Sequence, residues 1–139
     1  MTADKGLRQA YLDTVYRVEA KPHPIDIRIG ESNAALDKLL QANKVQQWAF
    51  VTASNPRSQA LSEEKNARRN AEMKSSLQQA GWRTADGVGL PSRPGWQPEH
   101  SVLILGIDRH AAIALARRWE QNAIVYGSVG QMPELLWVD

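Results

Sequence analysis

The chain has 139 residues, a formal net charge of +2 from 17 basic and 15 acidic side chains, and no cysteine. The length predicts a single domain over residues 1–139, and the missing cysteine excludes disulfide bonds, thiol nucleophiles and cysteine-ligated metal sites. No apolar run approaches the roughly 20 residues of a membrane helix, and the first residues lack the apolar core of a signal peptide, so we expect a cytoplasmic protein without a membrane partner.

The first part of the chain predicts a helix, two strands and a second helix. Apolar side chains recur at helical spacing over residues 7–15, which is typical of an amphipathic helix. Residues 16–18 predict the start of a strand. The strict alternation of apolar and polar side chains over residues 25–29 predicts a second, half-buried strand. Ser32 is the expected N-cap of a helix that ends near Asn43.

The middle of the chain predicts a buried strand, a long helix and a long loop. Residues 48–53 are almost continuously apolar, as is typical of a strand covered on both faces. Ser62 is the expected N-cap of a helix over residues 63–80. Residues 84–98 are rich in glycine and proline and predict a long loop, a feature that is often functional inside a compact domain.

The last part of the chain predicts three strands and one helix. Residues 102–107 form the second continuous apolar run, and Asp108 is the expected N-cap of the helix that follows. Residues 122–126 and 135–138 predict two further strands. Helices alternate with strands, but consecutive strands occur at both ends of the chain. The predicted fold class is therefore α/β (α+β), a single domain with a mixed β-sheet and helices packed on it.

The polar loop after the first buried strand is the leading candidate for a functional site. Asn55, Arg57 and Ser58 lie within four residues there, and ligands bind at strand ends in open α/β sheets. Arg57 is the expected anion-binding residue, helped by the N-terminus of the following helix. Asn55 is expected to orient the ligand, and Ser58 to add a hydrogen-bonding group.

Two asparagines on the following helix face the same way as its apolar residues. Asn66 and Asn70 share a helical stripe with Met73 and Leu77, so their amides are expected to point toward the core. A buried amide without a partner costs about 1–3 kcal/mol. One interpretation is that both amides tie down the backbone of the preceding loop. The other is that they line a ligand pocket, and the two are compatible.

A second polar cluster lies directly before the second buried strand. Glu99 and Ser101 alternate and therefore share a face at the start of that strand. Glu99 is the candidate catalytic acid or base, with His100 as a neighbouring acid or an ordinary surface residue. The alternative is a loop carboxylate that forms an ion pair with one of three arginines, Arg57, Arg69 or Arg93.

A third cluster, Gln121 and Asn122, opens a later strand. These amides either cap the end of the preceding helix or contact a ligand. The three histidines are scattered through the chain without metal-ligand spacing, so we expect no metal site. The phosphate-binding loop, the GxGxxG fingerprint and the GxSxG elbow are all missing, so no cofactor is expected and no motif names a reaction.

These segments together resemble a small bacterial family described as domain of unknown function 3293. The resemblance covers most of the chain and rests on residues 27–30, 50–58, 61–62, 66, 99–101 and 121–124. The chain departs from the family pattern at two positions. The family has tryptophan at the position of Ser54 and an acidic residue at the position of His100. The resemblance implies no activity, but it implies that the three polar clusters belong to one arrangement.

Two functions fit these patterns. The first is a site for a small ligand, a nucleotide or another phosphate-bearing molecule, that the protein binds or processes. The alternative is a non-catalytic module that binds protein or nucleic acid through the basic face of the helix over residues 63–80 and an exposed tryptophan, Trp82 or Trp96. The near balance of charge argues against strong nucleic-acid binding. In a third interpretation, Asn55, Asn66 and Glu99 form a buried polar network that only fixes the loop.

Overall fold

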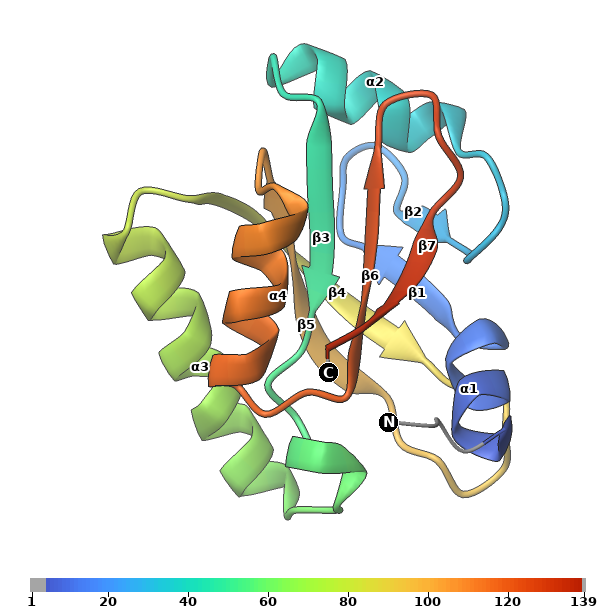
Figure 1. Cartoon of the computed structure of the whole chain (residues 1–139), viewed down its shortest axis with the longest axis vertical. Helices are drawn as coiled ribbons and strands as arrows, with labels where there is room; N and C mark the ends of the chain where they lie inside the picture. The colour runs from blue at the N-terminus through green and yellow to red at the C-terminus, as the bar shows by residue number, and fades with distance from the viewer. Residues whose placement is uncertain (1–4, 139) are drawn as a thin grey trace.

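The fold is built on one sheet, and the computed structural model describes residues 5–138 of the chain. Its seven strands are β1 (Val15–Val18), β2 (Ile25–Ile27), β3 (Gln47–Val51), β4 (Arg83–Leu90), β5 (Glu99–Leu105), β6 (Ala123–Ser128) and β7 (Glu134–Trp137). They lie in the order β2-β1-β4-β5-β3-β6-β7 (Figure 1). The predicted class, a sheet with helices packed on it, is confirmed.

All neighbouring strands are antiparallel. The sequence suggested a mixed sheet, and this detail was wrong. Three neighbouring pairs are consecutive in the chain: β1 with β2, β4 with β5, and β6 with β7. The helical connections do join strands that run in the same direction, β3 to β4 and β5 to β6. One antiparallel strand separates the members of each of these pairs, so they never hydrogen-bond to each other.

Strand β4 occupies the first half of the segment that was predicted to be a loop. It pairs with β1 on one side and with β5 on the other. The glycines that suggested a loop allow close packing instead. A Cβ atom on Gly87 would lie 2.6 Å from Cε2 of Phe50 and 2.9 Å from the backbone oxygen of Arg17. Glycine in a strand often marks such a close approach.

Within residues 5–138, four α-helices accompany the sheet: α1 (Lys5–Leu12), α2 (Ala34–Ala42), α3 (Glu63–Gln79) and α4 (Arg109–Arg118). The predicted caps of α3 and α4 are confirmed, since the side chains of Ser62 and Asp108 accept hydrogen bonds from the backbone N–H groups of Lys65 and Ala111. Helix α2 begins one residue later than predicted, with Asn33 as its N-cap.

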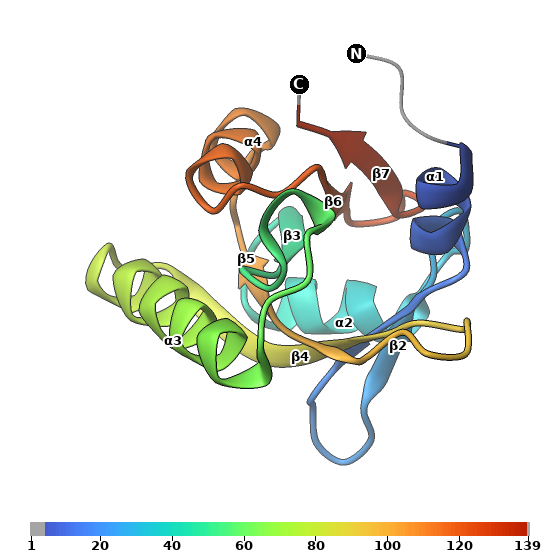
Figure 2. The ribbon, with the colours of Figure 1, turned by 90° about the horizontal axis from the view of Figure 1, so that it is seen from below.

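The sheet is curled (Figure 2). An apolar core lies on each of its faces. One core joins the sheet to α3 and α4, through residues such as Met73 and Ala112. The other contains Trp48 and Phe50 and packs against α2. The two edges of the sheet approach each other, because the backbone N–H of Gly30, after β2, donates to the carbonyl oxygen of Pro133, before β7, at 2.9 Å.

One end of the sheet collects the segments that the sequence singled out. Strand β3 ends beside the start of β5 and close to the start of β6, because both pairs are antiparallel. The loop of residues 52–58, Glu99 and residues 121–122 therefore meet there, at the lower end of Figure 1. We call this the loop end of the sheet. None of the helices within residues 5–138 is long and apolar enough to cross a membrane.

Candidate functional site

The loop of residues 52–58 has an unusual backbone. Asn55, Arg57 and Ser58 have φ angles of 47°, 53° and 62°, in the left-handed region that favours glycine. Another non-glycine residue of this kind, Glu120, lies opposite, and its carbonyl oxygen accepts a hydrogen bond of 2.6 Å from the backbone N–H of Arg57. Each such residue costs of order 1–3 kcal/mol and persists only where its surroundings hold it. Strain of this kind concentrates at functional sites.

The surroundings that hold this loop are the asparagines of α3. The backbone N–H of Asn55 donates to Oδ1 of Asn66 at 2.9 Å, and Nδ2 of Asn66 donates to Oδ1 of Asn55 at 2.8 Å. One turn later, Oδ1 of Asn70 accepts from the backbone N–H of Ala53, and Nδ2 of Asn70 donates to Oγ of Ser54, both at 2.8 Å. The helix therefore imposes the conformation of the loop.

The amide donors of these asparagines are fully used inside the protein. An amide NH₂ group has two N–H donors. The second N–H of Asn66 reaches the carbonyl oxygen of Leu61 at 3.4 Å, and that of Asn70 reaches the carbonyl oxygen of Asn66 at 3.0 Å. A ligand would have to break one of these bonds to contact either amide. Of the two interpretations of Asn66 and Asn70, the observed geometry favours the one in which they tie down the loop.

Arg69, between the two asparagines, is a third support of the loop and was not predicted in that role. Its Nε donates to the carbonyl oxygen of Ala53 at 2.6 Å, and its Nη2 donates to that of Trp119 at 2.8 Å. The arginine thereby joins the loop to the end of α4. Its spacing from Asn66 and Met73 places it on the same helical stripe, so the stripe itself was a usable signal.

The side chain of Gln121 makes a similar connection. Its Nε2 donates to the carbonyl oxygens of Ser54 and Trp119, both at 3.1 Å, and the residue is buried. The bond to Trp119, the C-cap of α4, agrees with the helix-capping interpretation. Gln121 therefore holds the loop and the end of α4 together.

Glu99 contacts the loop directly. Nδ2 of Asn55 donates to Oε2 of Glu99 at 2.7 Å. Burial raises the pKa of the Glu99 carboxyl, and the hydrogen bond from Asn55 lowers it by less. Within residues 5–138, Glu99 takes part in no ion pair, and Arg57 and Arg69 lie instead 3.9 and 3.6 Å from the Glu120 carboxylate. A carboxyl with a raised pKa is suited to giving and taking protons near neutral pH.

Two hydroxyl groups complete the cluster, and one of them comes from α1. Nδ2 of Asn122 donates to Oγ of Ser58 at 2.8 Å. Burial raises the pKa of the Tyr11 hydroxyl, a hydrogen bond with Ser58 lowers it, and the charge of Glu99 raises it. Tyr11 therefore lies beside Ser58 and close to Glu99. No local pattern points to Tyr11, because a tyrosine in an amphipathic helix resembles an ordinary core residue.

The comparison with known families covers this same arrangement. A family model described as protein of unknown function (DUF3293) matches residues 51–124, which is more than half of the chain. The chain belongs to this family. The predicted resemblance is confirmed, and the matched segment of the DUF3293 domain contains the loop of residues 52–58, α3, Glu99 and residues 121–122 but not Tyr11. No curated protein and no solved structure matches the chain.

The remaining predicted residues of this DUF3293 protein lie around the contact between Asn55 and Glu99 and, in the described part of the chain, make no side-chain bond to either side chain. Ser101 is buried, and its hydroxyl donates to the carbonyl oxygen of Glu99 at 3.0 Å. The side chain of His100 is exposed, and its backbone oxygen accepts a 2.6 Å hydrogen bond from Oγ1 of Thr52. Arg57 has a side chain that is 67% exposed, so it lies at the rim of the cluster.

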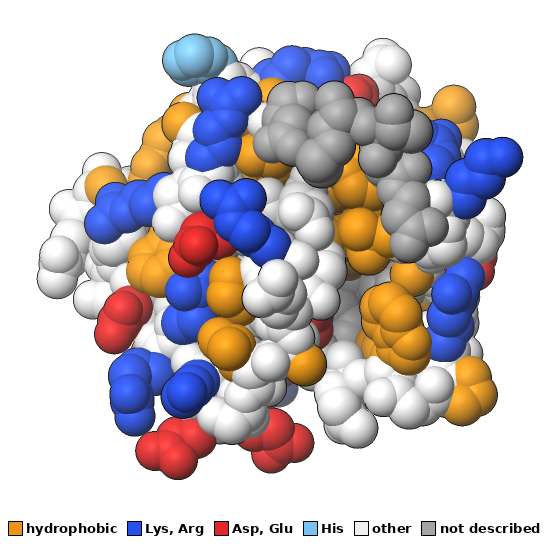
Figure 3. Space-filling view, turned by 60° about the horizontal axis from the view of Figure 1, so that its bottom comes forward, with side chains coloured by type: hydrophobic (Ala, Val, Ile, Leu, Met, Phe, Trp, Pro, Cys, Tyr) orange, Lys and Arg blue, Asp and Glu red, His pale blue; other side chains and the backbone are white. Residues whose placement is uncertain are grey.

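The N-terminus of α3, which the sequence suggested as a support for anion binding, carries two carboxylates. Ser62 caps it, and Glu63 and Glu64 occupy its first turn. These carboxylates place negative charge where the helix dipole would attract an anion. An anion at this end of the DUF3293 protein would therefore depend on Arg57 and the basic side chains around it. Figure 3 shows this end, where the surface is hollowed near the centre of the view and Lys and Arg side chains stand on both sides.

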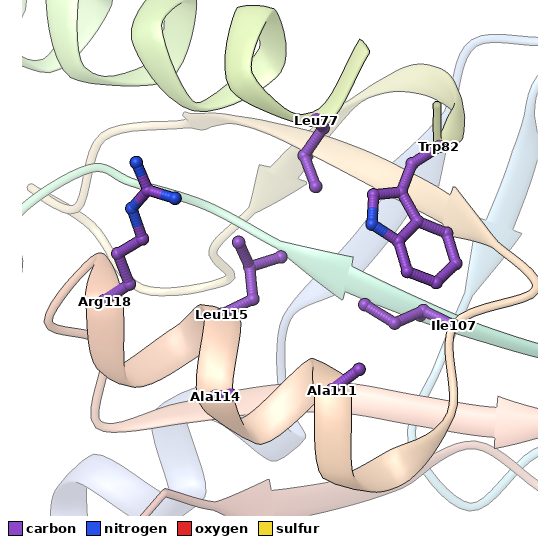
Figure 4. Close-up of a pocket in the computed structure, with 7 residues that line it drawn as sticks. All are labelled: Leu77, Trp82, Ile107, Ala111, Ala114, Leu115 and Arg118. Atoms are coloured by element: carbon purple, nitrogen blue, oxygen red, sulfur yellow. The ribbon is translucent and has the colours of Figure 1, made fainter. Parts of the chain in front are cut away.

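A metal site and an apolar groove are two other kinds of site that residues 5–138 could offer. In the described part of the chain, no group of three or more His, Asp or Glu side chains is placed to hold a metal ion. An apolar groove of about 260 Å³ lies between α3 and α4 (Figure 4) and is lined by Leu77, Trp82, Ile107, Ala111, Ala114, Leu115 and Arg118. Of the residues singled out in the sequence, Trp82, suggested for the interaction module, lines this groove, and none of the polar residues of the loop end does.

Proposed function

We propose that this protein binds a small phosphate-bearing molecule, such as a nucleotide, at the loop end of the sheet, and that Glu99 exchanges a proton with it. One observation carries the proposal: a strained loop, held by three side chains of α3, presents Asn55 to a partly buried carboxyl. A loop that only connected β3 to α3 would not require three left-handed residues within four positions.

In this proposal each polar residue has a separate role. Glu99 is the acid or base, since its raised pKa brings the carboxyl closer to neutral pH. Asn55 orients the Glu99 carboxyl through the bond from its Nδ2. Asn66, Asn70 and Arg69 position the loop and do not contact the ligand.

The phosphate group is assigned to Arg57. This residue belongs to the strained loop, and its guanidinium group is exposed. The contact between Arg57 and Glu120 is 3.9 Å long, and exposed pairs of this kind contribute at most about 1 kcal/mol. The side chain is therefore free to turn to a phosphate. A cytoplasmic location is part of the same proposal, and the cysteine-free composition is compatible with the reducing environment there.

The geometry lends less support to a module that binds through the basic face of α3. Arg68 lies 3.4 Å from Glu64, and Lys74 lies 2.7 Å from Asp86. Arg69 is committed to the loop. These pairs reduce the positive charge that the helix offers to a protein or nucleic acid.

A thermal-shift screen tests the proposal. Purified protein is heated with nucleotides, nucleosides, phosphosugars and short oligonucleotides. A ligand at 100 times its Kd stabilises by about 2.7 kcal/mol, which raises Tm by several degrees in a chain of this length. We expect the shift to disappear in Arg57→Ala and to persist in Arg117→Ala, a control at an exposed arginine of α4.

Two outcomes of the screen contradict the proposal. One is a shift with a phosphate-bearing compound that is equal in Arg57→Ala and wild type, which places the ligand elsewhere. The other is a shift with oligonucleotides alone that is lost when Arg68 and Lys74 are both replaced by alanine. That second result favours the interaction module.

A further inference from the structure

We infer that the ligand turns neighbouring hydroxyl groups toward Glu99, so that it is a sugar phosphate or a ribonucleotide, and that Tyr11 and Ser58 complete the sugar subsite. This inference rests on the proposed function and adds the part of the ligand that lies away from the phosphate. It also assigns a role to α1, which lies outside the segment matched by the family model.

The charge of Glu99 limits which part of the ligand can lie beside it. Glu99 is partly buried, and a phosphate beside it would place two negative charges together where water screens them poorly. The phosphate is therefore expected to bind away from Glu99, which agrees with its proposed position at the rim residue Arg57. The part of the ligand that faces Glu99 carries no negative charge and donates hydrogen bonds.

The Glu99 carboxylate has acceptor positions that its neighbours leave unused. A carboxylate has about four acceptor positions on its two oxygens. In the described chain, Oε2 of Glu99 accepts one hydrogen bond, from Asn55, and Oε1 accepts none. The nearby side chains that the structure records are neutral: the Asn55 amide and the hydroxyls of Ser58 and Tyr11. A carboxylate with spare acceptor positions is the group that dinucleotide-binding folds use to bind ribose hydroxyls.

Tyr11 and Ser58 supply hydroxyl groups that are suited to contacts with a sugar. Their hydroxyls both donate and accept hydrogen bonds, as sugar hydroxyls do. Both are held in place: the Tyr11 ring contacts Trp137 edge-on at 5.7 Å between centroids, and Ser58 accepts its bond from Asn122. The hydroxyl of Tyr16 also donates to the backbone oxygen of Tyr11 at 2.7 Å. The cluster therefore joins α1, the loop, β5 and the approach to β6.

The proposed phosphate site and the proposed sugar site are adjacent in the loop. Arg57 and Ser58 are consecutive residues, so their Cα atoms are about 3.8 Å apart. One short molecule that places a phosphate at Arg57 is therefore within reach of the Ser58 hydroxyl. In a pentose 5-phosphate, the phosphate and the ring hydroxyls are separated by a few bonds, which is compatible with this distance.

Calorimetric titration of the full chain tests the inference with matched pairs of probes. One pair is ribose 5-phosphate and 2-deoxyribose 5-phosphate, and the other is AMP and 2′,3′-dideoxy-AMP. Inorganic phosphate and phosphoethanolamine complete the set. We expect each hydroxylated compound to bind at least about ten-fold more tightly than its deoxygenated partner, because a polar site rejects a ligand that leaves its groups unpaired.

Variants locate the preference. Glu99→Gln and Tyr11→Phe should each reduce the preference for the hydroxylated compound, since the first removes the carboxylate and the second removes only a hydroxyl. Tyr11→Phe keeps the ring that contacts Trp137. Tyr126→Phe is the matched control, because Tyr126 lies within β6, where it pairs with Ala49 of β3 and its ring contacts Arg109 of α4.

The remaining outcomes separate the two proposals. Equal binding of hydroxylated and deoxygenated phosphates, weakened alike by Arg57→Ala, overturns the sugar subsite and leaves the phosphate site standing. Tighter binding of phosphoethanolamine than of ribose 5-phosphate also overturns it, since Glu99 then faces a cation. If none of the phosphate compounds binds, both proposals fail. The probe comparison uses the wild-type chain, so it does not depend on the folding of a variant.

Discussion

Replacing Asn66 by alanine measures how firmly α3 holds the strained loop. The substitution removes two hydrogen bonds to Asn55, one of 2.9 Å to its backbone N–H and one of 2.8 Å from the Asn66 amide. A buried donor left without a partner costs about 1–3 kcal/mol. Because Asn66 and Asn55 are both half-buried, water replaces part of what is lost, and we expect a loss of about 1–2 kcal/mol.

The measurement is urea unfolding, which reports the free energy of unfolding directly. The midpoint should fall while the slope with urea stays constant, because the surface exposed on unfolding is unchanged. In a heating experiment, a loss of this size corresponds to a decrease in Tm of roughly 3–8 °C for a chain of this length. Ser75→Ala, at an exposed position of the same helix, is the control and should change stability by less than about 0.5 kcal/mol.

Two results would refute this reasoning about Asn66. A loss no larger than that of the Ser75 control means that the loop keeps its conformation without the helix. A large loss with unchanged hydrogen-exchange protection in residues 52–58 means that the damage lies elsewhere in the structure. The asparagine would then not be the support that its contacts suggest.

Three further predictions concern Glu99, Arg69 and Gly87. Burial raises the pKa of Glu99, so the folded protein keeps this proton to a higher pH than the unfolded chain, and the contribution of Glu99 to stability is lost as pH rises through the folded pKa. Glu99→Gln should therefore gain stability relative to wild type between pH 4 and pH 7 in urea unfolding, and a constant or reversed difference contradicts this. Arg69→Ala should cost about 1–3 kcal/mol and Arg68→Ala less than about 0.5 kcal/mol, because only the first leaves a buried carbonyl oxygen, that of Ala53, without its side-chain donor; equal effects argue against that role. Gly87→Ala should lower Tm by an amount equivalent to about 1–3 kcal/mol through overpacking, whereas Gly89→Ala, with 3.9 Å of room, should cost less; similar losses at both would show that Phe50 does not limit this position.

The parts of the site that local patterns encode were predictable. Ser62 and Asp108 cap helices in the sequence and in the structure, because an N-cap depends on the next few residues only. The inward position of Asn66 and Asn70 followed from helical spacing, since their neighbours on the stripe, Met73 and Leu77, had to face the core.

The parts that depend on distant contacts were not predictable in this way. Gly87 suggested a loop because glycine is common in loops. The reason for this glycine is its contact with the Phe50 ring, and that contact is not visible locally because Phe50 is far away in sequence. The antiparallel order of the sheet depends on which strands become neighbours, and the chain does not state this locally. Tyr11 joins the cluster only because β1 and β7 bring α1 to the loop end, beside Trp137.

The closing of the sheet limits how this chain can associate with copies of itself. The two edge strands, β2 and β7, have three and four residues, so each exposes few backbone groups to a further strand. The hydrogen bond between Gly30 and Pro133 uses part of what remains at these edges. Long, flat, unpaired edges are what allow sheets to extend into aggregates. A protein with this architecture is protected from adding strands at its edges, and side-chain surfaces are left as its means of recognising a partner.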